Sequence, residues 1–227
     1  MKQGEFENKR VVVTDSDNYM GPVAVEHFRS LGASVLAWST ALDSNEAVDK
    51  LMAEAGQTDI LIANFGTEPR PNKVENITDD DWFSLCDGLL HPFMRVVRAF
   101  AGQMKSRGQG KIVGMTSASP LRAIYGASAY SAMRGAQNAF VRAAGSELAR
   151  AGVQFNAIAQ NYVENDAYYP LERRESEKFK EELKQVPAGR CAPAQETANL
   201  MAFLASEDNT HIVGQAVPFA GGWATNT

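Results

Sequence analysis

The fold is decided by the stretch K-I-V-G-M-T-S-A-S-P-L-R-A-I-Y-G-A-S-A-Y-S-A-M-R, which runs from Lys111 to Arg134. Its first five residues form an apolar run of the length and composition of a buried strand. Its end opens a long, alanine-rich helical pattern. A short strand that leads into a helix in this way is typical of the repeating unit of α/β proteins.

The same alternation continues in both directions along the chain. Apolar runs predict strands at Arg10–Thr14, Ser34–Trp38, Asp59–Asn64, Lys111–Met115, Gln154–Ala159 and Gln215–Phe219. Helical patterns are predicted at Val23–Leu31, Asn45–Ala55, Asp80–Arg107, Ala127–Ala151, Glu172–Gln185 and Glu196–Ser206. The sequence therefore predicts an α/β protein with a doubly wound parallel sheet, and residues 1–227 as one Rossmann-like domain.

Composition excludes several classes of function. The chain has 227 residues, a net charge of −5 and 44% hydrophobic residues, which is ordinary for a globular protein. No basic block favours a nucleic-acid or anionic-membrane partner. No apolar run reaches the roughly 20 residues of a membrane span, and residues 1–10 do not resemble a signal peptide, so we expect a cytoplasmic protein. Cys86 and Cys191 match no metal spacing, and we expect no metal.

Four segments should meet where the ligand of such a fold binds. In open parallel sheets the binding crevice lies beyond the carboxyl ends of the strands. The turn after the first strand, Asn64–Gly66, Thr116–Ser117 and the segment that starts at Gln160 all follow predicted strands. Ser117 is therefore expected at a ligand crevice.

Three side chains of the opening stretch could handle a proton. Tyr130 and Arg134 are four residues apart on a predicted helix, which places them on one face, one turn apart. Ser117 lies thirteen residues before Tyr130. A permanent cation favours a phenolate and should lower the pKa of Tyr130 from its ordinary value of about 10, toward that of a general base.

The first turn lacks what a dinucleotide needs. Glycines normally let the backbone approach a pyrophosphate there, but in T-D-S-D-N-Y-M-G, from Thr14 to Gly21, only the last residue is glycine. Trp38-Ser39-Thr40 stands where an acidic residue would hold a ribose. We predict a Rossmann-like fold without a functional dinucleotide site and with no cofactor. A variant loop that still binds NAD(P) is the alternative.

The chain resembles the short-chain dehydrogenase/reductase superfamily over nearly its whole length. A-N-F-G at Ala63–Gly66 stands in place of its N-N-A-G, and Gly221-Gly222 near the end also matches. That superfamily has a lysine four residues after its tyrosine, where this chain has Arg134. The segments T-D-S-D-N-Y-M-G, A-N-F-G, A-Y-S-A-M-R and A-Q-N-Y are similar to one offshoot of the superfamily, the halohydrin dehalogenases.

This resemblance implies a cofactor-independent lyase. Ser117 would bind the hydroxyl oxygen of a vicinal haloalcohol, and Tyr130, supported by Arg134, would remove its proton. The alkoxide would then expel the halide and close an epoxide; the reverse reaction would open an epoxide with a small anion. The resemblance also implies a homotetramer, in which the helices Asp80–Arg107 and Ala127–Ala151 could pack against other subunits.

The same resemblance implies a halide and substrate site. Its residues would be Tyr19, Phe65, Gln160, Asn161, Tyr162 and Val163. Backbone N–H groups of residues 160–163 would form an anion nest, faced by the ring of Tyr19, and Tyr162 is included for its backbone. Tyr168 and Tyr169, like Phe65, could line the pocket or could serve only for packing.

Three alternatives remain open at this stage. Ser119 could be the active hydroxyl instead of Ser117, although only Ser117 has the thirteen-residue spacing to Tyr130. The chain could be an NAD(P)-dependent oxidoreductase with an unusual first turn. It could also be a non-catalytic binding module, although the complete set of Ser117, Tyr130 and Arg134 argues against this.

Overall fold

The computed structural model describes residues 4–67 and 70–225. Residues 1–3 belong to the stretch 1–10, which is not expected to be a signal peptide, and they lie outside the described residues. The described chain contains one sheet of six strands in the order β2-β1-β3-β4-β5-β6. The strands are β1 (Arg10–Thr14), β2 (Ser34–Trp38), β3 (Ile60–Ala63), β4 (Gly110–Ser117), β5 (Val153–Gln160) and β6 (Ala216–Phe219). Every neighbouring pair is parallel, as the alternating sequence pattern predicts.

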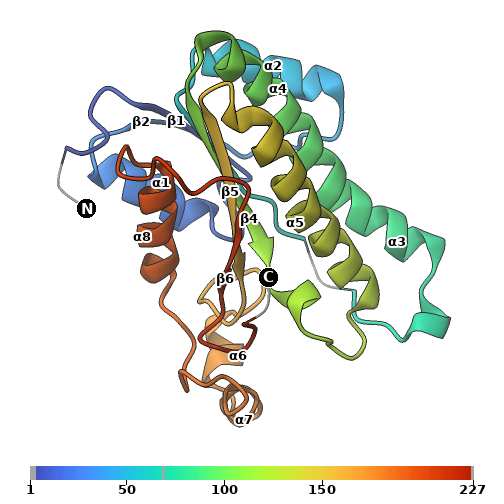
Figure 1. Ribbon diagram of the computed structural model, residues 1–227. Coiled ribbons are helices and arrows are strands. Elements are labelled where there is room, and N and C mark those ends of the chain that lie inside the picture. The colour runs from blue at the N-terminus through green and yellow to red at the C-terminus, as the bar shows by residue number, and fades with distance from the viewer. Residues whose placement is uncertain (1–3, 68–69, 226–227) are drawn as a thin grey trace.

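Helices cover both faces of this sheet (Figure 1). Their bounds are α1 (Gly21–Ser30), α2 (Asn45–Ala55), α3 (Asp79–Leu85), α4 (His91–Arg107), α5 (Ser128–Ala149), α6 (Leu171–Glu175), α7 (Glu177–Leu183) and α8 (Ala194–Ala205). Helices α1 and α8 pack together on one face, where Phe28 and Met201 join one apolar cluster. Helices α2, α4 and α5 cover the other face, where Phe100 and Val141 join a second cluster. The chain thus has the doubly wound architecture expected from its sequence.

The long β4–β5 pair positions the candidate site. Both strands have eight residues, and they stay in register from Gly110 opposite Val153 to Ser117 opposite Gln160. Each extends further toward its carboxyl end than the apolar run alone predicts. The extension brings Ser117 and Gln160 together at the same edge of the sheet.

The predicted helix Asp80–Arg107 is interrupted. It comprises α3, five residues of π-helix (Cys86–Leu90) and then α4. Pro92 follows the π segment, and its lack of an N–H removes one hydrogen bond of a regular α-helix. Similarly, the predicted helix Glu172–Gln185 divides into α6 and α7 at Ser176, whose side chain caps α7 by accepting from the Phe179 N–H.

The carboxyl edge of the sheet is the place for a ligand. Strand order reverses at β1, which has β2 on one side and β3 on the other, and crevices form at such switch points. Helices α6 and α7 extend beyond this edge (Figure 1). Within the described parts of the chain, no helix combines the length and the apolar character needed to cross a membrane.

Candidate active site

Arg134 is the centre of the site. It lies on α5 and is fully buried, and all five of its guanidinium N–H donors are used. Its Nε donates to the hydroxyl oxygen of Tyr130 over 3.0 Å. Its other donors reach the carbonyls of Met115 (3.2 Å) and Phe65 (3.1 Å), the side chain of Gln137 (3.0 Å) and the hydroxyl of Tyr168 (3.2 Å). The cation is therefore held rigidly between β4, the loop after β3 and its own helix.

Three tyrosines surround this cation. The guanidinium carbon lies 5.3 Å from the ring centre of Tyr130 and 5.4 Å from that of Tyr19, while Tyr168 is bound through its hydroxyl. Burial disfavours a charged arginine, but the oxygens of Tyr130, Tyr168 and Tyr19 hold the pKa of Arg134 above its ordinary value. Burial also raises the pKa of Tyr19 and of Tyr168. Arg134 is a permanent charge here, and Tyr19 and Tyr168 stay protonated.

The turn after β1 places the ring of Tyr19 against the guanidinium of Arg134. Asp15 and Tyr19 have φ values of 46° and 52°, in the left-handed region that side chains rarely adopt. The Tyr19 hydroxyl donates to the carbonyl of Thr116 over 3.1 Å. Gly66 packs so closely against this turn that a Cβ at that position would lie 2.7 Å from the Cβ of Tyr19. Only glycine at residue 66 lets the ring occupy this position.

The backbone N–H groups of this turn are already bonded. Those of Ser16, Asn18, Tyr19, Met20 and Gly21 donate respectively to Trp38 O, Asp15 O, Asn18 Oδ1, Asn64 Oδ1 and Asn18 O. The next residue, Pro22, has no N–H to offer. A carboxylate oxygen of Asp15 also accepts the N–H of Gly66, over 2.9 Å. The donors that would hold a phosphate at the start of α1 are thus largely used within the protein.

A cavity of about 320 Å³ opens beside these tyrosines. It is lined by Tyr19, Pro71, Ser117, Ser119, Ile124, Tyr125, Gly126, Ala127, Tyr130, Gln160, Asn161, Val163, Asn165, Tyr168, Tyr169 and Arg173. Of the residues that the sequence assigns to the site, six line this cavity: Ser117, Tyr130, Tyr19, Gln160, Asn161 and Val163. Arg134 lies behind the wall and reaches the cavity through the tyrosine hydroxyls.

Ser117 and Ser119 play different parts in this wall. The hydroxyl oxygen of Ser117 accepts the backbone N–H of Ser119 over 3.1 Å, which leaves the Ser117 O–H to donate toward the cavity. Asn138 on α5 holds the Ser117 carbonyl over 3.2 Å. The Ser119 hydroxyl is buried and has no hydrogen-bond partner among the described residues.

Besides Arg134, two of the residues assigned from the sequence, Phe65 and Tyr162, are not part of the cavity lining. The ring of Phe65 packs against Phe93, with ring centres 6.5 Å apart, and only its carbonyl enters the site, as an acceptor for Arg134. The ring of Tyr162 points into an aromatic cluster, where it stacks on Tyr169 at 5.7 Å and meets Trp223 at 6.0 Å. Phe65 therefore does not line the cavity with its side chain, and Tyr162 can contribute only its backbone.

The segment 160–163 forms a tight turn, but only some of its backbone N–H groups are available to bind an anion. Tyr162 has a φ of 52°, again in the left-handed region. The N–H of Asn161 already donates to the carbonyl of Phe219 over 3.1 Å, and the side chain of Asn161 accepts the hydroxyl of Tyr169 over 2.7 Å. The N–H of Tyr162 interacts with the hydroxyl of Tyr169, whereas the hydrogen bonds of the described residues include none from the N–H of Val163. An anion nest would use the N–H of Val163 and would compete with the Tyr169 hydroxyl for that of Tyr162.

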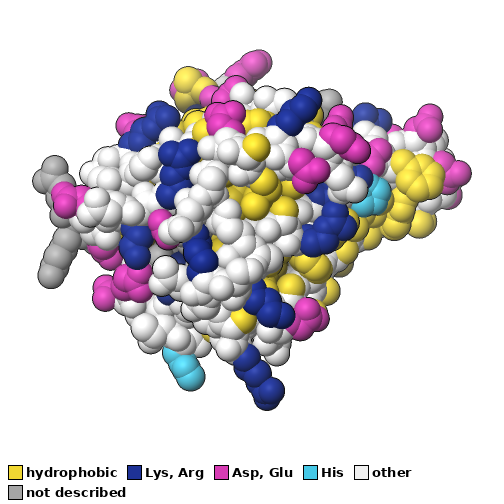
Figure 2. Space-filling model, turned by 90° about the horizontal axis from the view of Figure 1, so that it is seen from above, with side chains coloured by type: hydrophobic (Ala, Val, Ile, Leu, Met, Phe, Trp, Pro, Cys, Tyr) yellow, Lys and Arg dark blue, Asp and Glu magenta, His cyan; other side chains and the backbone are white. Residues whose placement is uncertain are grey.

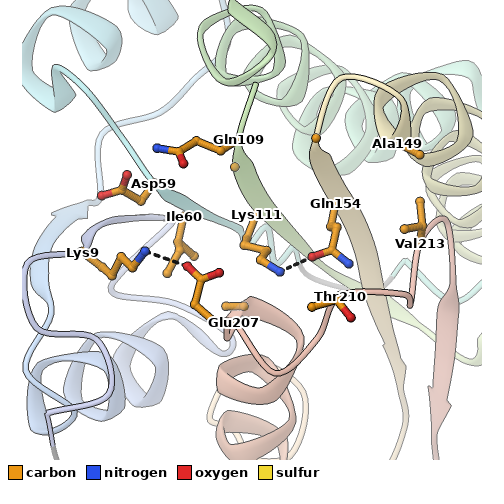
Figure 3. Close-up of a pocket in the computed structure, with 13 residues that line it drawn as sticks. Lys9, Asp59, Ile60, Gln109, Lys111, Ala149, Gln154, Glu207, Thr210 and Val213 are labelled. Carbon is orange, nitrogen blue, oxygen red and sulfur yellow. Dashed lines mark hydrogen bonds and ion pairs between the residues drawn. The ribbon is translucent and has the colours of Figure 1, made fainter. Parts of the chain in front are cut away.

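A second hollow lies at the opposite edge of the sheet and has a different character. Lys9, Lys111, Gln154 and Glu207 line it, at the amino ends of the strands (Figure 3). Lys9 forms an ion pair with Glu207 over 2.7 Å, and Lys111 is bonded to Gln154 and to the carbonyl of Asn209. Because both lysines already have partners within the protein, we interpret this hollow as structural.

Comparisons with known proteins place the chain in a family. The family described as enoyl-(acyl carrier protein) reductase matches residues 6–224, and its members are short-chain dehydrogenases/reductases. This chain belongs to that superfamily. The order of its parallel strands and the carboxyl-edge cavity agree with this membership.

Curated relatives of this superfamily member include reductases and a dehydrogenase. It is 27% identical to the 3-oxoacyl-[acyl-carrier-protein] reductase FabG of Escherichia coli (strain K12), over 96% of this chain and 98% of the relative. It is 29% identical to the meso-2,3-butanediol dehydrogenase of Serratia marcescens, over 96% of this chain and 95% of the relative.

Solved structures of the superfamily include a second kind of relative. A dehalogenation enzyme superposes with a TM-score of 0.89 at 25% identity, over 96% of this chain and 99% of that one. The structure of gox2181 superposes with a TM-score of 0.87 at 24% identity, over 96% of each chain, and shows the fold alone. The comparisons therefore establish the superfamily and leave the reaction to the geometry of the site.

The sequence assigns Tyr168 no definite role in the site of this short-chain dehydrogenase/reductase. The sequence left open whether it lines a pocket or packs, whereas the structure places its hydroxyl on Arg134 and its ring 5.1 Å from that of Tyr19. It follows β5 by eight residues in an irregular segment, so no helical or strand spacing connects it to Tyr130. Gln137 was also missed, although its spacing of three residues from Arg134 on α5 could have indicated their contact.

Proposed function

We propose that the chain is a cofactor-independent halohydrin dehalogenase, which converts vicinal haloalcohols to epoxides with release of halide and a proton. The observation that carries this proposal is the hydrogen bond from the fully buried Arg134 to the hydroxyl of Tyr130. A fixed positive charge against one phenol favours its phenolate, and the same phenol opens on a cavity beside Ser117. The similarity to a dehalogenation enzyme of known structure supports the same reaction.

The residues of the first turn do not fit a dinucleotide. Most of the N–H groups that would hold a pyrophosphate are bonded internally, and the ring of Tyr19 lies under Arg134. The small hollow on the other side of this turn is lined by three carboxylates, from Asp15, Asp43 and Asp87. They would repel the phosphates of a nucleotide. We derive no hydride transfer from this site.

The proposed reaction starts with Ser117 and Tyr130. The Ser117 O–H, oriented by the N–H of Ser119, donates to the hydroxyl oxygen of the haloalcohol. The phenolate of Tyr130 takes the hydroxyl proton, and the oxygen left behind attacks the neighbouring carbon. The carbon–halogen bond breaks as the carbon–oxygen bond forms, and the halide leaves with the bonding electrons. The proton passes from Tyr130 to water, which restores the base.

The halide would leave toward the turn at residues 160–163. The N–H of Val163 can receive an anion there, joined by that of Tyr162 if the anion displaces the Tyr169 hydroxyl, next to the apolar ring faces of the cavity. The amide of Gln160 lies in the same wall, and its Oε1 has no partner among the described residues. In reverse, a small anion bound at this turn would open an epoxide whose oxygen is protonated by Tyr130.

Halide release tests this proposal. The purified protein is incubated with 1,3-dichloro-2-propanol in the absence of any nucleotide, and chloride is measured over time between mildly acidic and alkaline pH. We expect turnover by the wild-type protein and a loss of at least about 10²-fold in Tyr130→Phe, since that variant lacks the base. Absence of chloride release by the wild-type protein at every pH would refute the proposal.

A second candidate is an NAD(P)-dependent oxidoreductase, which the sequence relatives favour because they are reductases and dehydrogenases. Quenching of protein fluorescence by NADH and NADPH separates the two functions. Binding at micromolar concentrations would support this candidate. We expect no saturable binding, because the amides and carboxylates of the first turn oppose it.

We also propose that the protein acts as a homotetramer. Helix α3 exposes Trp82 and Phe83, with 40% and 59% of their surfaces accessible. Figure 2 shows hydrophobic side chains in a band that runs toward the end of the molecule carrying α3. Exposed aromatic residues of this size are typical of surfaces that other subunits cover.

A further inference from the structure

The hydroxyl oxygen of Tyr168 already accepts two hydrogen bonds, so that only its O–H remains to interact with another group. Its backbone N–H donates to Asn165 Oδ1 over 2.9 Å, which fixes the start of the side chain. Its hydroxyl oxygen accepts twice, from the backbone N–H of Thr67 over 3.1 Å and from a terminal nitrogen of Arg134 over 3.2 Å. Since a phenol oxygen accepts at most two hydrogen bonds, only the O–H proton of Tyr168 remains available to bind a third group.

The hydroxyl of Tyr130 lies beside that of Tyr168, because both are bonded to Arg134. Tyr130 is bound to Nε and Tyr168 to Nη2, so both phenols sit on the same guanidinium of Arg134. Their ring centres are 6.1 Å apart, and the neighbouring Tyr130 raises the pKa of the Tyr168 hydroxyl. The pair occupies the edge of an arginine that ordinarily holds the two oxygens of one carboxylate.

Such an edge can hold two phenol oxygens of which one carries a negative charge. When Tyr130 loses its proton, its oxygen can accept from both Arg134 and Tyr168. The reverse assignment is disfavoured, because burial and the neighbouring Tyr130 raise the pKa of Tyr168, which keeps its own proton. Tyr168 is therefore the phenol of the pair that keeps its proton and can serve as a donor.

We propose that Tyr168 is a positioning residue, whose hydroxyl donates to the oxygen of Tyr130 and stabilises the phenolate that acts as base. This inference deepens the proposed dehalogenase function and rests on it for its role in catalysis. It touches no substrate atom. Its effect is to lower the pH at which the base becomes available, in addition to the effect of the Arg134 charge.

Tyrosinate absorbance near 295 nm tests the inference without any substrate. The protein is titrated with base, and the contribution of Tyr130 is obtained by subtracting the Tyr130→Phe variant. The same difference is measured in the Tyr168→Phe background. We expect the midpoint of Tyr130 ionisation to rise by about 1 pH unit or more when the Tyr168 hydroxyl is removed, since a hydrogen bond to a charged group contributes on that scale.

Tyr19→Phe is the matched control. Its ring also lies against Arg134, but its hydroxyl donates to the Thr116 carbonyl. Its removal should leave the midpoint of Tyr130 in place. An unchanged midpoint in Tyr168→Phe, or an equal rise in Tyr19→Phe, would overturn the inference.

A second measurement uses the wild-type chain, in case Tyr168→Phe fails to fold. In NMR spectra of protein labelled with ¹³C at the tyrosine ζ carbons, the signal that disappears in Tyr130→Phe reports the ionisation of Tyr130. The Tyr168 signal should shift at the same midpoint while remaining in the range of a neutral phenol. A Tyr168 signal that does not respond to this ionisation would contradict the inference.

The pH dependence of halide release separates this inference from the proposed function. If the wild type releases halide, Tyr168→Phe should need a higher pH for half-maximal rate and recover much of its activity at alkaline pH. A loss of rate that is equal at all pH values would indicate a purely structural role and overturn the inference. If the wild type releases no halide but the absorbance midpoint shifts, the dehalogenase proposal fails and the contact between the two tyrosines stands.

Discussion

The Nε–H of Arg134 donates to the hydroxyl oxygen of Tyr130 over 3.0 Å, and no part of Arg134 reaches solvent. The same guanidinium holds the carbonyls of Met115 and Phe65, at the ends of two parallel strands. The side chain of Arg134 thus places a positive charge beside Tyr130 and also links this tyrosine to the sheet. Stability and activity should therefore respond together when this residue is changed.

Arg134→Lys should reduce both the stability of the protein and its activity. Lysine has three donors in place of five and cannot reach the same acceptors, so buried carbonyls lose their partners. We expect a loss of about 2 kcal/mol or more in the free energy of unfolding, measured in urea. Some halide release should remain, with a shifted pH–rate profile.

Arg142→Lys is the control for this change, because Arg142 is exposed on the same helix. It should leave both the unfolding curve and the pH profile as in the wild type. An unchanged pH profile in Arg134→Lys would contradict the role assigned to the cation.

Ser117→Ala should lower kcat/KM for a haloalcohol by about 10²-fold, the usual effect of removing one oriented donor from an active site. Ser119→Ala should cost clearly less, because it keeps the N–H that holds Ser117 and removes a hydroxyl without a partner among the described residues. Steady-state chloride release measures both. A larger loss of kcat/KM in Ser119→Ala than in Ser117→Ala would contradict this assignment and indicate Ser119 as the active hydroxyl.

Asp15→Asn should make the protein more stable at pH 7. Burial is the main reason that the pKa of Asp15 is raised, although hydrogen bonds from Gly66 and Asn18 oppose the rise. For a carboxyl group whose folded pKa exceeds its unfolded pKa, stability falls as pH increases through that interval, so the ionised group is a cost at neutral pH. Asparagine tolerates the positive φ of residue 15 and can still accept from Gly66.

Melting temperatures at pH 4 and pH 7 check this prediction. The advantage of Asp15→Asn over the wild type should be small at pH 4 and larger at pH 7. Asp49→Asn, exposed on α2, should show no such trend. An advantage that shrinks as the pH rises would show that the sign is wrong.

Replacing Trp82 and Phe83 together by serine should yield a smaller assembly. Light scattering after size exclusion should give the wild type a mass near four times the 24.7 kDa chain, and the double variant a lower mass. Phe203→Ser provides the comparison, because Phe203 is 38% exposed on α8, away from α3. A wild-type monomer would refute the proposed tetramer.

The sheet and most of its helices could be predicted because their signals are local. The strand Arg10–Thr14 was predicted from β-branched residues that are buried on both faces, and its bounds are confirmed. The helix Asn45–Ala55 is confirmed as well, with Ser44 as its N-cap. The Tyr130–Arg134 contact followed from helical spacing alone.

The remainder depends on contacts between distant parts of the chain. The π segment Cys86–Leu90 interrupts a pattern that reads as one continuous amphipathic helix. Tyr168 reaches Arg134 from an irregular segment, and it is fixed by the N–H of Thr67, 101 residues earlier. The resemblance assigns Phe65 to the substrate site, but its ring packs against Phe93. No local periodicity encodes such long-range choices.

The most direct test of the central claim is the balance of products. Wild-type protein without nucleotide is given a bromohydrin, and bromide, protons and epoxide are measured in one reaction. The account predicts the three in equal amounts, and none above background with Tyr130→Phe. A ketone product that forms only when NAD⁺ or NADP⁺ is added, with no bromide released, would contradict it.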